Sequence, residues 1–514
     1  MLWTDKAKKI LEKYWGFSNL KEKQIAVINE LLSGNDVIGL LPTGYGKSMC
    51  YLIPPLVSKK AIIIISPLIS LMDDQKEKLL KMNIPVSALH GNNKNKDCEL
   101  FEIIDGQIKI IYMSPEFLIK GDGLELINTL NDSKMLGFLA IDEAHCISVW
   151  GHDFRPEYLK IKSFRDLYPH IPILAVTATA TNNVVKEIAT NLNLSHPEII
   201  KADFDRPNLF LECISVKKND INLLKPYFKK YKNEKIIIYT NSRQNTMDLS
   251  NEINQLEPNS HISDAYHAGM SKALREKVQT NFSEGKIKII VSTIAFGMGV
   301  DQIVRCVIIF GSPSSIEEYW QQIGRAGRDN LSAETVLFYQ YKSLKIAKSF
   351  ILKECTNQTI KNNKIKNLSI IGEYFYLKTC RRRFVLEHFD QLPNFFCCNS
   401  CDNCNNNALL QDITNTVWDL KNNIISDDIT SKNIIENLVN QKLIKINNNK
   451  VVFINSLYNW NRIINMSKFT LDNLPEKLKI KLPIQQLCNS IEVSELDRCD
   501  NMFNKIKIKR KIKF

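Results

Sequence analysis

The sequence predicts an α/β protein with two parallel-sheet units in tandem, and three observations lead to this fold class. Short apolar segments alternate with longer segments of helical character over the first part of the chain. The same alternation starts again after about residue 205. The apolar segments are hydrophobic throughout, which is typical of strands buried on both faces of a parallel sheet.

The first unit is expected over residues 1–205 and the second over 206–345. Ligands of such sheets bind at the carboxyl ends of the strands, and two units in tandem leave a cleft there. The expected strands are 36–41, 61–66, 108–114, 136–142 and 173–179 in the first unit, and 235–240, 288–293 and 306–311 in the second.

Three smaller regions are expected after the second unit. Residues 346–405 are helical and lysine-rich and end in a cysteine cluster. Residues 406–480 contain helices and a hairpin at 442–454, where two short alternating segments flank three asparagines. Residues 481–514 end in KIKIKRKIKF, which is either a DNA-binding or nuclear-targeting tail or simply a solvated one.

Composition narrows the class of protein and of partner. The chain has 514 residues, 44% of them hydrophobic, and a formal net charge of +13. Because no run of about 18 apolar residues is present and the start is charged, we expect neither a membrane span nor secretion. The positive charge favours an acidic partner, most commonly nucleic acid. The 13 cysteines form an odd set with one tight cluster, which favours an intracellular protein with a metal site. The compartment would be the nucleus in a eukaryote and the cytoplasm otherwise.

A phosphate-binding loop is predicted where a strand is followed by LPTGYGKS and a helix-like stretch. Gly44 and Gly46 allow positive φ and let backbone amides approach an anion closely. Lys47 can reach the β- and γ-phosphates, and Ser48 can ligate Mg²⁺. Leu41 stands where the full motif has its first glycine. The alternative is a glycine-rich turn without a ligand.

Paired carboxylates in IDEAH predict the second half of this site. Asp142 and Glu143 follow an apolar strand, which we expect to be a neighbour of the phosphate-loop strand in the sheet. Asp142 can hold Mg²⁺, and Glu143 can orient and activate the attacking water. His145 is expected to connect the site to the second unit. An acidic helix start is the alternative interpretation.

The segment QQIGRAGRD contributes Gln321, Arg325 and Arg328 from the second unit. The two arginines are three residues apart, so we expect them to share a helix face. Guanidinium groups suit the charge that develops on a transferring phosphoryl group. We expect them to reach a nucleotide only when the cleft closes. The alternative is a solvated basic helix.

The cysteines of TCRRRFVLEHF and CCNSCDNC predict a metal site. Four thiolates at these spacings suit tetrahedral Zn²⁺, with an iron–sulfur cluster as the chemical alternative. The arginines of the CRRR run form either a solvated helix face or a contact to a DNA backbone.

Taken in order, these motifs resemble the RecQ-type DNA helicases of helicase superfamily 2. The resemblance covers about residues 10–405 and includes WGFSNLKEKQ, ISPLISLMDDQ, SPEFL, VTATA, IIYTNSR, STIAFGMGVD and the DEAH box. It implies two RecA-like domains, a zinc-binding subdomain and a divergent winged-helix-like region. It also implies an ATP hydrolase that translocates 3′ to 5′ on single-stranded DNA and unwinds duplexes in repair, recombination or replication.

The resemblance also assigns residues at the nucleotide. Phe17 would stack on the adenine and Gln24 would pair with its edge, while Lys21 stands where the family usually has arginine. Asp301 would approach the ribose or the interface of the two units. The implied ATP-binding set is Phe17, Lys21, Gln24, Thr43, Gly44, Gly46, Lys47, Ser48 and Asp301; the catalytic set is Lys47, Asp142, Glu143, Gln321, Arg325 and Arg328; Ser48 and Asp142 would hold magnesium.

The segment AHCISVWGHDFRPEY is similar to the aromatic-rich loop of RecQ proteins. Trp150 and Phe154 would stack on bases, and Arg155 would meet a phosphate. The alternative is that both aromatic side chains are core anchors. Because RNA helicases with a DEAH box lack this loop, the resemblance favours DNA.

The same family register selects Cys380, Cys398, Cys401 and Cys404 as zinc ligands and leaves Cys397 spare. The implied cofactors are ATP, Mg²⁺ and Zn²⁺. The implied partners are single-stranded, duplex or forked DNA, with single-stranded-DNA-binding or repair proteins, and we expect a monomer without a membrane. A non-catalytic DNA-binding scaffold and an RNA helicase are the competing functions.

Overall fold

The computed structural model describes most of the chain up to residue 405 and a short segment beyond it. The described residues are 3–91, 96–118, 121–149, 151, 154–256, 261–296, 302–377, 379–395 and 397–405, with the backbone of 444–447 and 450–453. Two predicted site residues, Trp150 and Asp301, lie outside them. The whole of the tail expected at 481–514 and most of the region 406–480 also lie outside them.

The first domain is built on an all-parallel sheet of seven strands in the order β3-β4-β2-β5-β6-β1-β7. The strands are β1 (Val37–Leu40), β2 (Ala61–Ile65), β3 (Val86–Leu89), β4 (Ile110–Met113), β5 (Leu136–Ile141), β6 (Ile173–Thr177) and β7 (Glu198–Lys201). All five predicted strands are confirmed. The apolar pattern did not reveal β3, which contains a serine, or the largely exposed β7.

One expectation about this sheet is wrong. The strand before the phosphate loop, β1, and the strand before the carboxylates, β5, are not neighbours, because β6 pairs with both. The two motifs still meet, since all strands are parallel and their carboxyl ends lie at one edge of the sheet.

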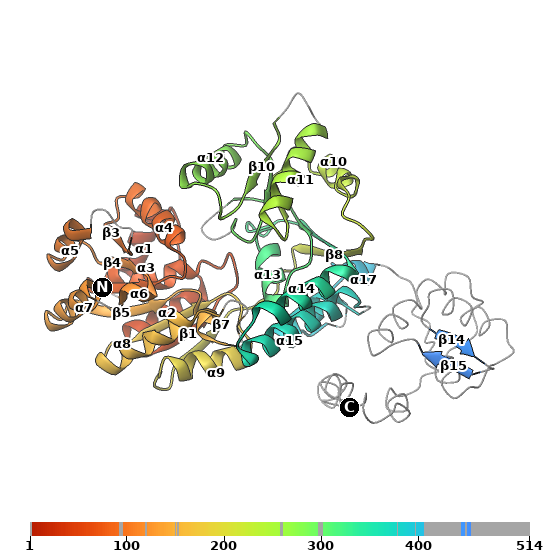
Figure 1. Ribbon diagram of the computed structural model, residues 1–514. Helices are drawn as coiled ribbons and strands as arrows, with labels where there is room; N and C mark the ends of the chain where they lie inside the picture. The colour runs from red at the N-terminus through yellow and green to blue at the C-terminus, as the bar shows by residue number, and fades with distance from the viewer. Residues whose placement is uncertain are drawn as a thin grey trace. The chain divides into compact units, whose positions relative to one another are not determined.

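Helices cover both faces of this sheet, as its fully buried strands require (Figure 1). One core cluster joins side chains of α2, α3 and α4 to Ile62, Ile64, Tyr112 and Val176 of the sheet. The helices are α1 (Trp3–Trp15), α2 (Glu22–Leu32), α3 (Lys47–Ser58), α4 (Ile69–Lys81), α5 (Lys96–Ile104), α6 (Pro115–Leu118), α7 (Asp122–Asp132), α8 (Lys162–Leu167) and α9 (Asn182–Asn191), with short 3₁₀ turns at Ala144–Ile147 and Pro156–Ile161.

The second domain repeats this design with six parallel strands in the order β10-β11-β9-β12-β13-β8. The three predicted strands are confirmed, whereas β8, β10 and β13 were not foreseen. The strands are β8 (Leu209–Ser215), β9 (Ile236–Tyr239), β10 (Ser263–Tyr266), β11 (Ile289–Ser292), β12 (Cys306–Phe310) and β13 (Ala333–Tyr339); the helices are α10 (Lys225–Lys230), α11 (Arg243–Leu256), α12 (Lys272–Ser283) and α13 (Ile316–Ile323), with a 3₁₀ turn at Ile221–Leu223.

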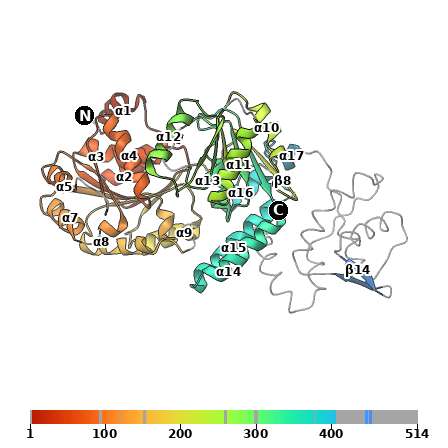
Figure 2. The same ribbon diagram turned by 45° about the horizontal axis from the view of Figure 1, so that its top comes forward.

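A helical region follows β13, as the sequence predicts. Its two long helices, α14 (Tyr341–Glu354) and α15 (Gln358–Phe375), lie side by side (Figures 1 and 2). The short helices α16 (Arg381–His388) and α17 (Asp402–Asn405) flank the cysteine segment. This segment covers the edge strand β8, because Leu211 donates its amide to Ser400 O at 3.1 Å and the Cys213 amide bonds Asp402 Oδ2 at 3.0 Å.

The predicted hairpin is confirmed by two antiparallel strands, β14 (Ile444–Asn447) and β15 (Lys450–Phe453). Contacts place this hairpin in a separate unit from the two sheets. No helix in the described part of the chain has both the length and the apolar character that a membrane crossing requires.

Candidate ATP site and cysteine cluster

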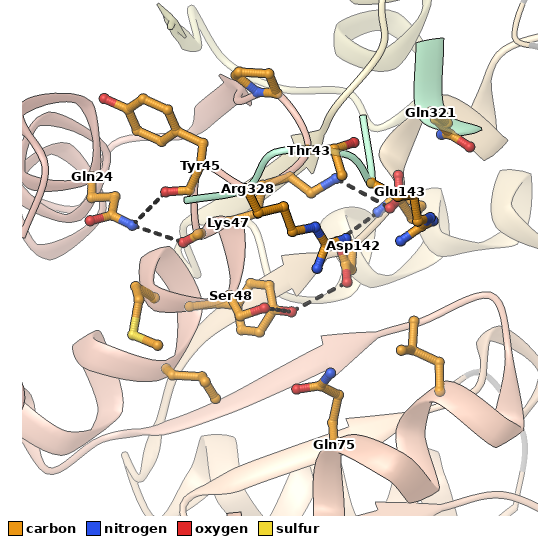
Figure 3. A pocket seen from close by; sticks show the side chains of 18 of the residues that line it. Gln24, Thr43, Tyr45, Lys47, Ser48, Gln75, Asp142, Glu143, Gln321 and Arg328 are labelled. Carbon is orange, nitrogen blue, oxygen red and sulfur yellow. Dashed lines mark hydrogen bonds and ion pairs between the residues drawn. The ribbon is translucent and has the colours of Figure 1, made fainter. Parts of the chain in front are cut away.

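One cavity of about 1070 Å³ collects most of the predicted nucleotide-binding residues. It lies at the carboxyl ends of the strands and is lined from both domains, as Figure 3 shows for ten labelled residues. The predicted residues in its lining are Phe17, Lys21, Gln24, Thr43, Gly44, Gly46, Lys47, Ser48, Asp142, Glu143, Gln321, Arg325 and Arg328. Phe154 and Arg155 are not among the described residues that line it.

The phosphate loop, residues 41–48, has the backbone that its glycines allow. Gly44 and Gly46 have φ values of 83° and 90°, and α3 begins at Lys47, so Lys47 and Ser48 of the loop form the first residues of this helix. A side chain at Gly46 would bring its Cβ within 2.6 Å of Gln24 Nε2. The loop therefore directs the amino end of a helix and the Lys47 side chain at the cavity, which is the arrangement that binds anions.

The two carboxylates stand where β5 ends, opposite the loop. Glu143 adopts the left-handed conformation with φ 49°, which is unusual for this residue type. Its Oε1 lies 3.2 Å from Lys47 Nζ, and its Oε2 lies 3.3 Å from His145 Nδ1. His145 also lies 2.8 Å from Thr177 Oγ1 on β6. These contacts join His145 to Glu143 and to β6 within the first domain.

The pKa values of the two neighbouring carboxyl groups are shifted in opposite directions. Burial, followed by the Glu143 charge, raises the pKa of Asp142 to about 6. Burial alone would also raise the pKa of Glu143, but Lys47 and His145 outweigh it and hold that pKa well below its usual range. Burial would lower the pKa of His145, yet Cys146 and Glu143 raise it to about 10. Glu143 is thus ionised between two cations, whereas at Asp142 burial and the Glu143 charge outweigh the attraction of Lys47.

That imbalance fits a divalent cation beside Asp142. Tyr51, one turn along α3 from Ser48, places its hydroxyl 3.1 Å from Ser48 Oγ and 3.2 Å from Asp142 Oδ2. The donors are hard oxygen atoms, which Mg²⁺ prefers, and a bound dication would favour the ionised form of the buried Asp142 carboxyl group.

One expectation about the arginines of the second domain is wrong. Helix α13 ends at Ile323 with Gly324 at its cap, so Arg325 and Arg328 lie in a turn and share no helix face. Gly327 has φ 56°, which turns the chain out of the helical path. Both arginines line the cavity, and a Cβ at Gly44 would lie 3.6 Å from Arg328 Cγ. Figure 3 shows Arg328 pointing into the cavity near Asp142.

The opposite end of the cavity contains the residues expected at the base. Phe17 is 55% exposed, so its ring is open for stacking. The Gln24 amide donates to Tyr45 O at 3.1 Å and Gly46 O at 2.9 Å, while its Oε1 accepts from the Lys21 amide at 2.8 Å. Gln24 is therefore a brace of the phosphate loop in this state. Lys21 Nζ lies 3.4 Å from Gly44 O and 4.7 Å from the Tyr45 ring centroid.

The described part of the aromatic loop lies between the first domain and the helical region. Phe154 is half-buried, and Arg155 Nη1 donates to Pro67 O at 2.5 Å. Asn363 of α15 donates to Val149 O at 3.0 Å. The loop backbone is thus held from both sides, next to the carboxylates that precede it in the chain.

Four sulfur atoms form the second candidate site. The Sγ atoms of Cys380, Cys398, Cys401 and Cys404 all lie within 4.8 Å of one another. A tetrahedral Zn²⁺ with Zn–S bonds of about 2.3 Å needs sulfurs about 3.8 Å apart, so the group fits this ion. Hydrogen bonds to Cys398 and Cys401, then burial, raise the pKa of the Cys380 thiol far above its usual range, and a dication would reverse this effect. Cys397 is exposed and lies 3.2 Å from Asn399 Oδ1, outside the cluster.

Both interpretations of the CRRR run are wrong for its first two arginines, which are buried. Arg381 donates to Asp402 at 2.5 Å and to Tyr374 O at 2.8 Å. Arg382, 1% exposed, donates to Asp205 at 2.9 Å. Arg383 is half-buried and bonds Glu387 at 2.8 Å.

Comparison with known protein families agrees with this division of the chain. The DEAD/DEAH box helicase family matches residues 21–188, the helicase conserved C-terminal domain matches 219–330, and the RecQ zinc-binding domain matches 341–405. A RecQ helicase of Haemophilus influenzae is 38% identical over 77% of this chain and 63% of its own length. The chain belongs to the RecQ family of helicases. Its two helicase domains are those of an ATP-dependent enzyme.

Similar proteins also occur in a virus and in yeast. A protein of Acanthamoeba polyphaga mimivirus, provisionally named ATP-dependent RNA helicase R290, is 40% identical over 84% of this chain and 75% of its own length. The yeast helicase SGS1 of Saccharomyces cerevisiae is 35% identical over 79% of this chain and 29% of its own length. The chain therefore spans less than two thirds of the bacterial and yeast relatives.

Solved structures share the fold of this RecQ-family helicase. The helicase MrfA bound to DNA has a TM-score of 0.56 at 18% identity, over 90% of this chain and 64% of its own. The helicase Lhr of Mycobacterium smegmatis, bound to single-stranded DNA and AMP-PNP, has a TM-score of 0.53 at 17% identity, over 69% and 49%. Two tandem RecA-like domains are therefore the architecture of this chain.

Sequence reasoning missed two residues of the site in this RecQ-family helicase. Tyr51 could have been found, because it lies three positions after Ser48 on a helix and must face the same side. Arg206 lies between the two sheets in sequence and contacts both domains through backbone carbonyls. Backbone acceptors leave no pattern in a sequence, so only the fold reveals that contact.

Proposed function

We propose that this protein hydrolyses ATP to move 3′ to 5′ along single-stranded DNA and to unwind duplexes, in repair, recombination or replication. The observation that carries the proposal is the cavity lined by a phosphate loop and two carboxylates from one domain and by two arginines from the other. A triphosphate bound there would touch both domains at once, so its hydrolysis would change their contact.

Each polar side chain has a role at the phosphates in this proposal. Lys47 binds the β- and γ-phosphates, Ser48 and Asp142 hold Mg²⁺, which neutralises developing charge when bound, and Arg325 and Arg328 stabilise the transferred phosphoryl group. Lys47 now pairs with Glu143 and must leave it to meet a phosphate. Because that cation moves away, the pKa of Glu143 rises and the carboxylate becomes a better acceptor for the water it orients.

The base and ribose end follows the family resemblance. Phe17 stacks on adenine, and Gln24 pairs with its edge. Since Gln24 braces Tyr45 and Gly46 of the phosphate loop in this structure, base recognition requires the amide to exchange partners. Asp301 keeps its proposed place near the ribose.

DNA is the proposed substrate because the aromatic loop follows the carboxylates directly in the chain. In this proposal Trp150 and Phe154 stack on bases and Arg155 contacts a phosphate. Binding of a DNA strand to this loop would therefore affect the position of Glu143, which directly precedes the loop in the chain. Single-stranded, duplex and forked DNA are the proposed partners, with single-stranded-DNA-binding or repair proteins. We propose a monomer that works inside the cell.

One assay tests this proposal against its two competitors. ATP turnover is measured without nucleic acid, with single-stranded DNA and with RNA, for the wild type, for Lys47→Ala and for Lys9→Ala, an exposed control on α1. DNA-stimulated turnover that Lys47→Ala abolishes and Lys9→Ala retains supports the proposal. Stimulation by RNA alone would replace it with the activity in the name of R290. An absence of turnover under all conditions would leave a DNA-binding scaffold.

Zinc at the four cysteines is proposed as a structural ion, because four thiolates leave no ligand position for water. Elemental analysis of the purified protein should find one equivalent of zinc, which Cys401→Ser lowers. Iron with visible absorbance would overturn this assignment in favour of an iron–sulfur cluster.

A further inference from the structure

Arg206 occupies an unusual position in the segment that joins the two sheets. Its Nη2 donates to Ala326 O at 2.8 Å and to Gly327 O at 2.9 Å. Its Nη1 lies 3.4 Å from Gly324 O and 3.5 Å from Thr43 O, and its Nε lies 3.4 Å from Asn208 Oδ1. These bonds use every N–H that a guanidinium carries.

The acceptors belong to the two segments that form the ATP site. Thr43 is part of the phosphate loop, whereas Gly324, Ala326 and Gly327 belong to the arginine loop, residues 324–329, which carries Arg325 and Arg328. The planar guanidinium of Arg206 thus bonds both loops, and Arg206 is not among the described residues that line the cavity. Asn208 adds bonds of 2.9 Å to Gly327 O and to Leu331 O on the same side.

The Arg206 backbone is fixed in turn by Arg382 of α16. Arg382 donates to Asp205 Oδ1 at 2.9 Å and also bonds the carbonyls of Arg206 and Leu209. Its side chain is 2% exposed, so these bonds are shielded from water. The residues on both sides of Arg206 are therefore held by the helical region that carries the cysteines.

We propose that Arg206 is a positioning residue that sets the arginine loop against the phosphate loop for the transition state of ATP hydrolysis. The inference rests on the proposed function, because it gives Arg325 and Arg328 a role at the transferred phosphoryl group. Lysine cannot replace Arg206, since its ammonium has three donors and lacks the planar fork that spans both loops. A displacement of about 1 Å in a group that acts on the transition state costs up to about 100-fold in rate.

A purely structural role for Arg206 predicts a different result. Loss of folding would weaken nucleotide binding, DNA binding and turnover together. Loss of positioning leaves ATP binding, which depends mainly on the phosphate loop, and weakens only what the arginine loop adds in the transition state.

The experiment compares Arg206→Lys with wild type and with Arg165→Lys. Arg165 serves as a control because it is a buried arginine that donates to a backbone carbonyl, Pro169 O at 2.7 Å, and to Asp36, and the contacts described for it include neither loop. The measurements are the affinity for AMP-PNP, the affinity for ADP with aluminium fluoride as a transition-state mimic, the DNA-stimulated kcat, and Tm.

Arg206→Lys should bind AMP-PNP within about 3-fold of wild type but lose about 10- to 100-fold in kcat and in affinity for the fluoride mimic. Arg165→Lys should lower Tm without separating the two affinities. Equal affinity of Arg206→Lys and wild type for the mimic overturns the inference, and so does an equal loss for both ligands.

Two further variants keep the outcomes distinct. If Arg206→Lys does not fold, Asn208→Ala removes the bond to Gly327 O of the same loop, and it should show the same separation of the two affinities at smaller size. Wild-type behaviour of this variant would then overturn the inference. Arg328→Ala is measured alongside: if it retains full kcat, the proposed function of the arginine loop fails, whereas a loss in Arg328→Ala without a loss in Arg206→Lys removes only the positioning role.

Discussion

Two groups of arginines in this chain have similar sequences and opposite surroundings. The arginine loop directs Arg325 and Arg328 into the ATP cavity, beside the phosphate loop. The arginine clasp, Arg381–Arg383, directs its first two side chains inward to carboxylates and backbone carbonyls. Arg325 and Arg328 follow α13, whereas the clasp forms the first turn of α16, and each group suggests a nucleic-acid or phosphate contact when viewed alone.

The difference lies in the partners that the fold supplies. In the clasp, Asp402 and Asp205 neutralise Arg381 and Arg382, so no charge remains for a ligand. Across the cavity from the arginine loop, the Glu143 carboxylate pairs with Lys47, and the Asp142 carboxylate is a proposed ligand of Mg²⁺. A buried guanidinium with a carboxylate partner therefore indicates structure, and one that faces an anion-binding loop indicates catalysis.

The largest effect should come from the arginine loop. Arg328→Ala should lower the DNA-stimulated kcat by about 10³-fold or more, because an arginine at the transferred phosphoryl group contributes that much in related chemistry. The affinity for AMP-PNP and Tm should stay near wild type. Steady-state turnover and nucleotide titration check this. A variant that loses nucleotide affinity and kcat in equal measure would place Arg328 among the ground-state contacts.

Substitutions in the arginine clasp should lower the stability of the fold instead of the catalytic rate. Arg382→Met leaves Asp205 without its buried partner and should cost about 3 kcal/mol of folding free energy, since breaking a buried ion pair costs about 3–5 kcal/mol and Asp205 keeps some exposure. The matched change Arg383→Met, at a half-buried position, should cost about 1 kcal/mol or less. Thermal unfolding and limited proteolysis measure both. Equal Tm values for the two variants would contradict the comparison.

These same residues show which parts of the site could be predicted from the sequence. The arginine loop was predictable, because QQIGRAGRD carries a family pattern and its partners in the site carry patterns too. The clasp was not, because its partners are Asp205, Asp402 and backbone carbonyls far away in sequence. Burial of a charged group depends on tertiary contacts, which single-sequence patterns do not encode.

The strands show the same limit. Uniformly apolar β1, β2 and β12 could be found from the sequence, since strands buried on both faces carry a continuous pattern. The exposed edge strand β7 lacks such a pattern, and the order of strands was wrong where β6 separates β1 from β5. Sheet order is a property of crossover connections, so motif order along the chain does not determine it.

Arg155 combines features of the two arginine groups, so its replacement should give an effect of intermediate size. It donates to Pro67 O, as a clasp residue would, whereas the proposed function gives it a contact to a DNA phosphate. We expect Arg155→Gln to weaken single-stranded-DNA binding about 10-fold and to reduce the slope of log affinity against log salt by about 0.7, the value for one phosphate on a single strand. Fluorescence anisotropy at several salt concentrations checks this. A loss of affinity with an unchanged slope would move Arg155 into the structural group.

The smallest effect concerns the carboxylate that faces the arginine loop. Because burial and Glu143 raise the pKa of Asp142 to about 6, this group binds a proton as the pH falls below that value. Mg²⁺ must then displace the proton, so the Mg²⁺ concentration for half-maximal turnover should rise about 4-fold between pH 7 and pH 5.5, as the ionised fraction falls. Saturating Mg²⁺ should restore most of the rate at pH 5.5, which separates this competition from acid unfolding. An Mg²⁺ requirement that stays constant over this range would show that Asp142 keeps an ordinary pKa, and it would weaken the contrast between a carboxylate that awaits a cation and those that the clasp arginines already neutralise.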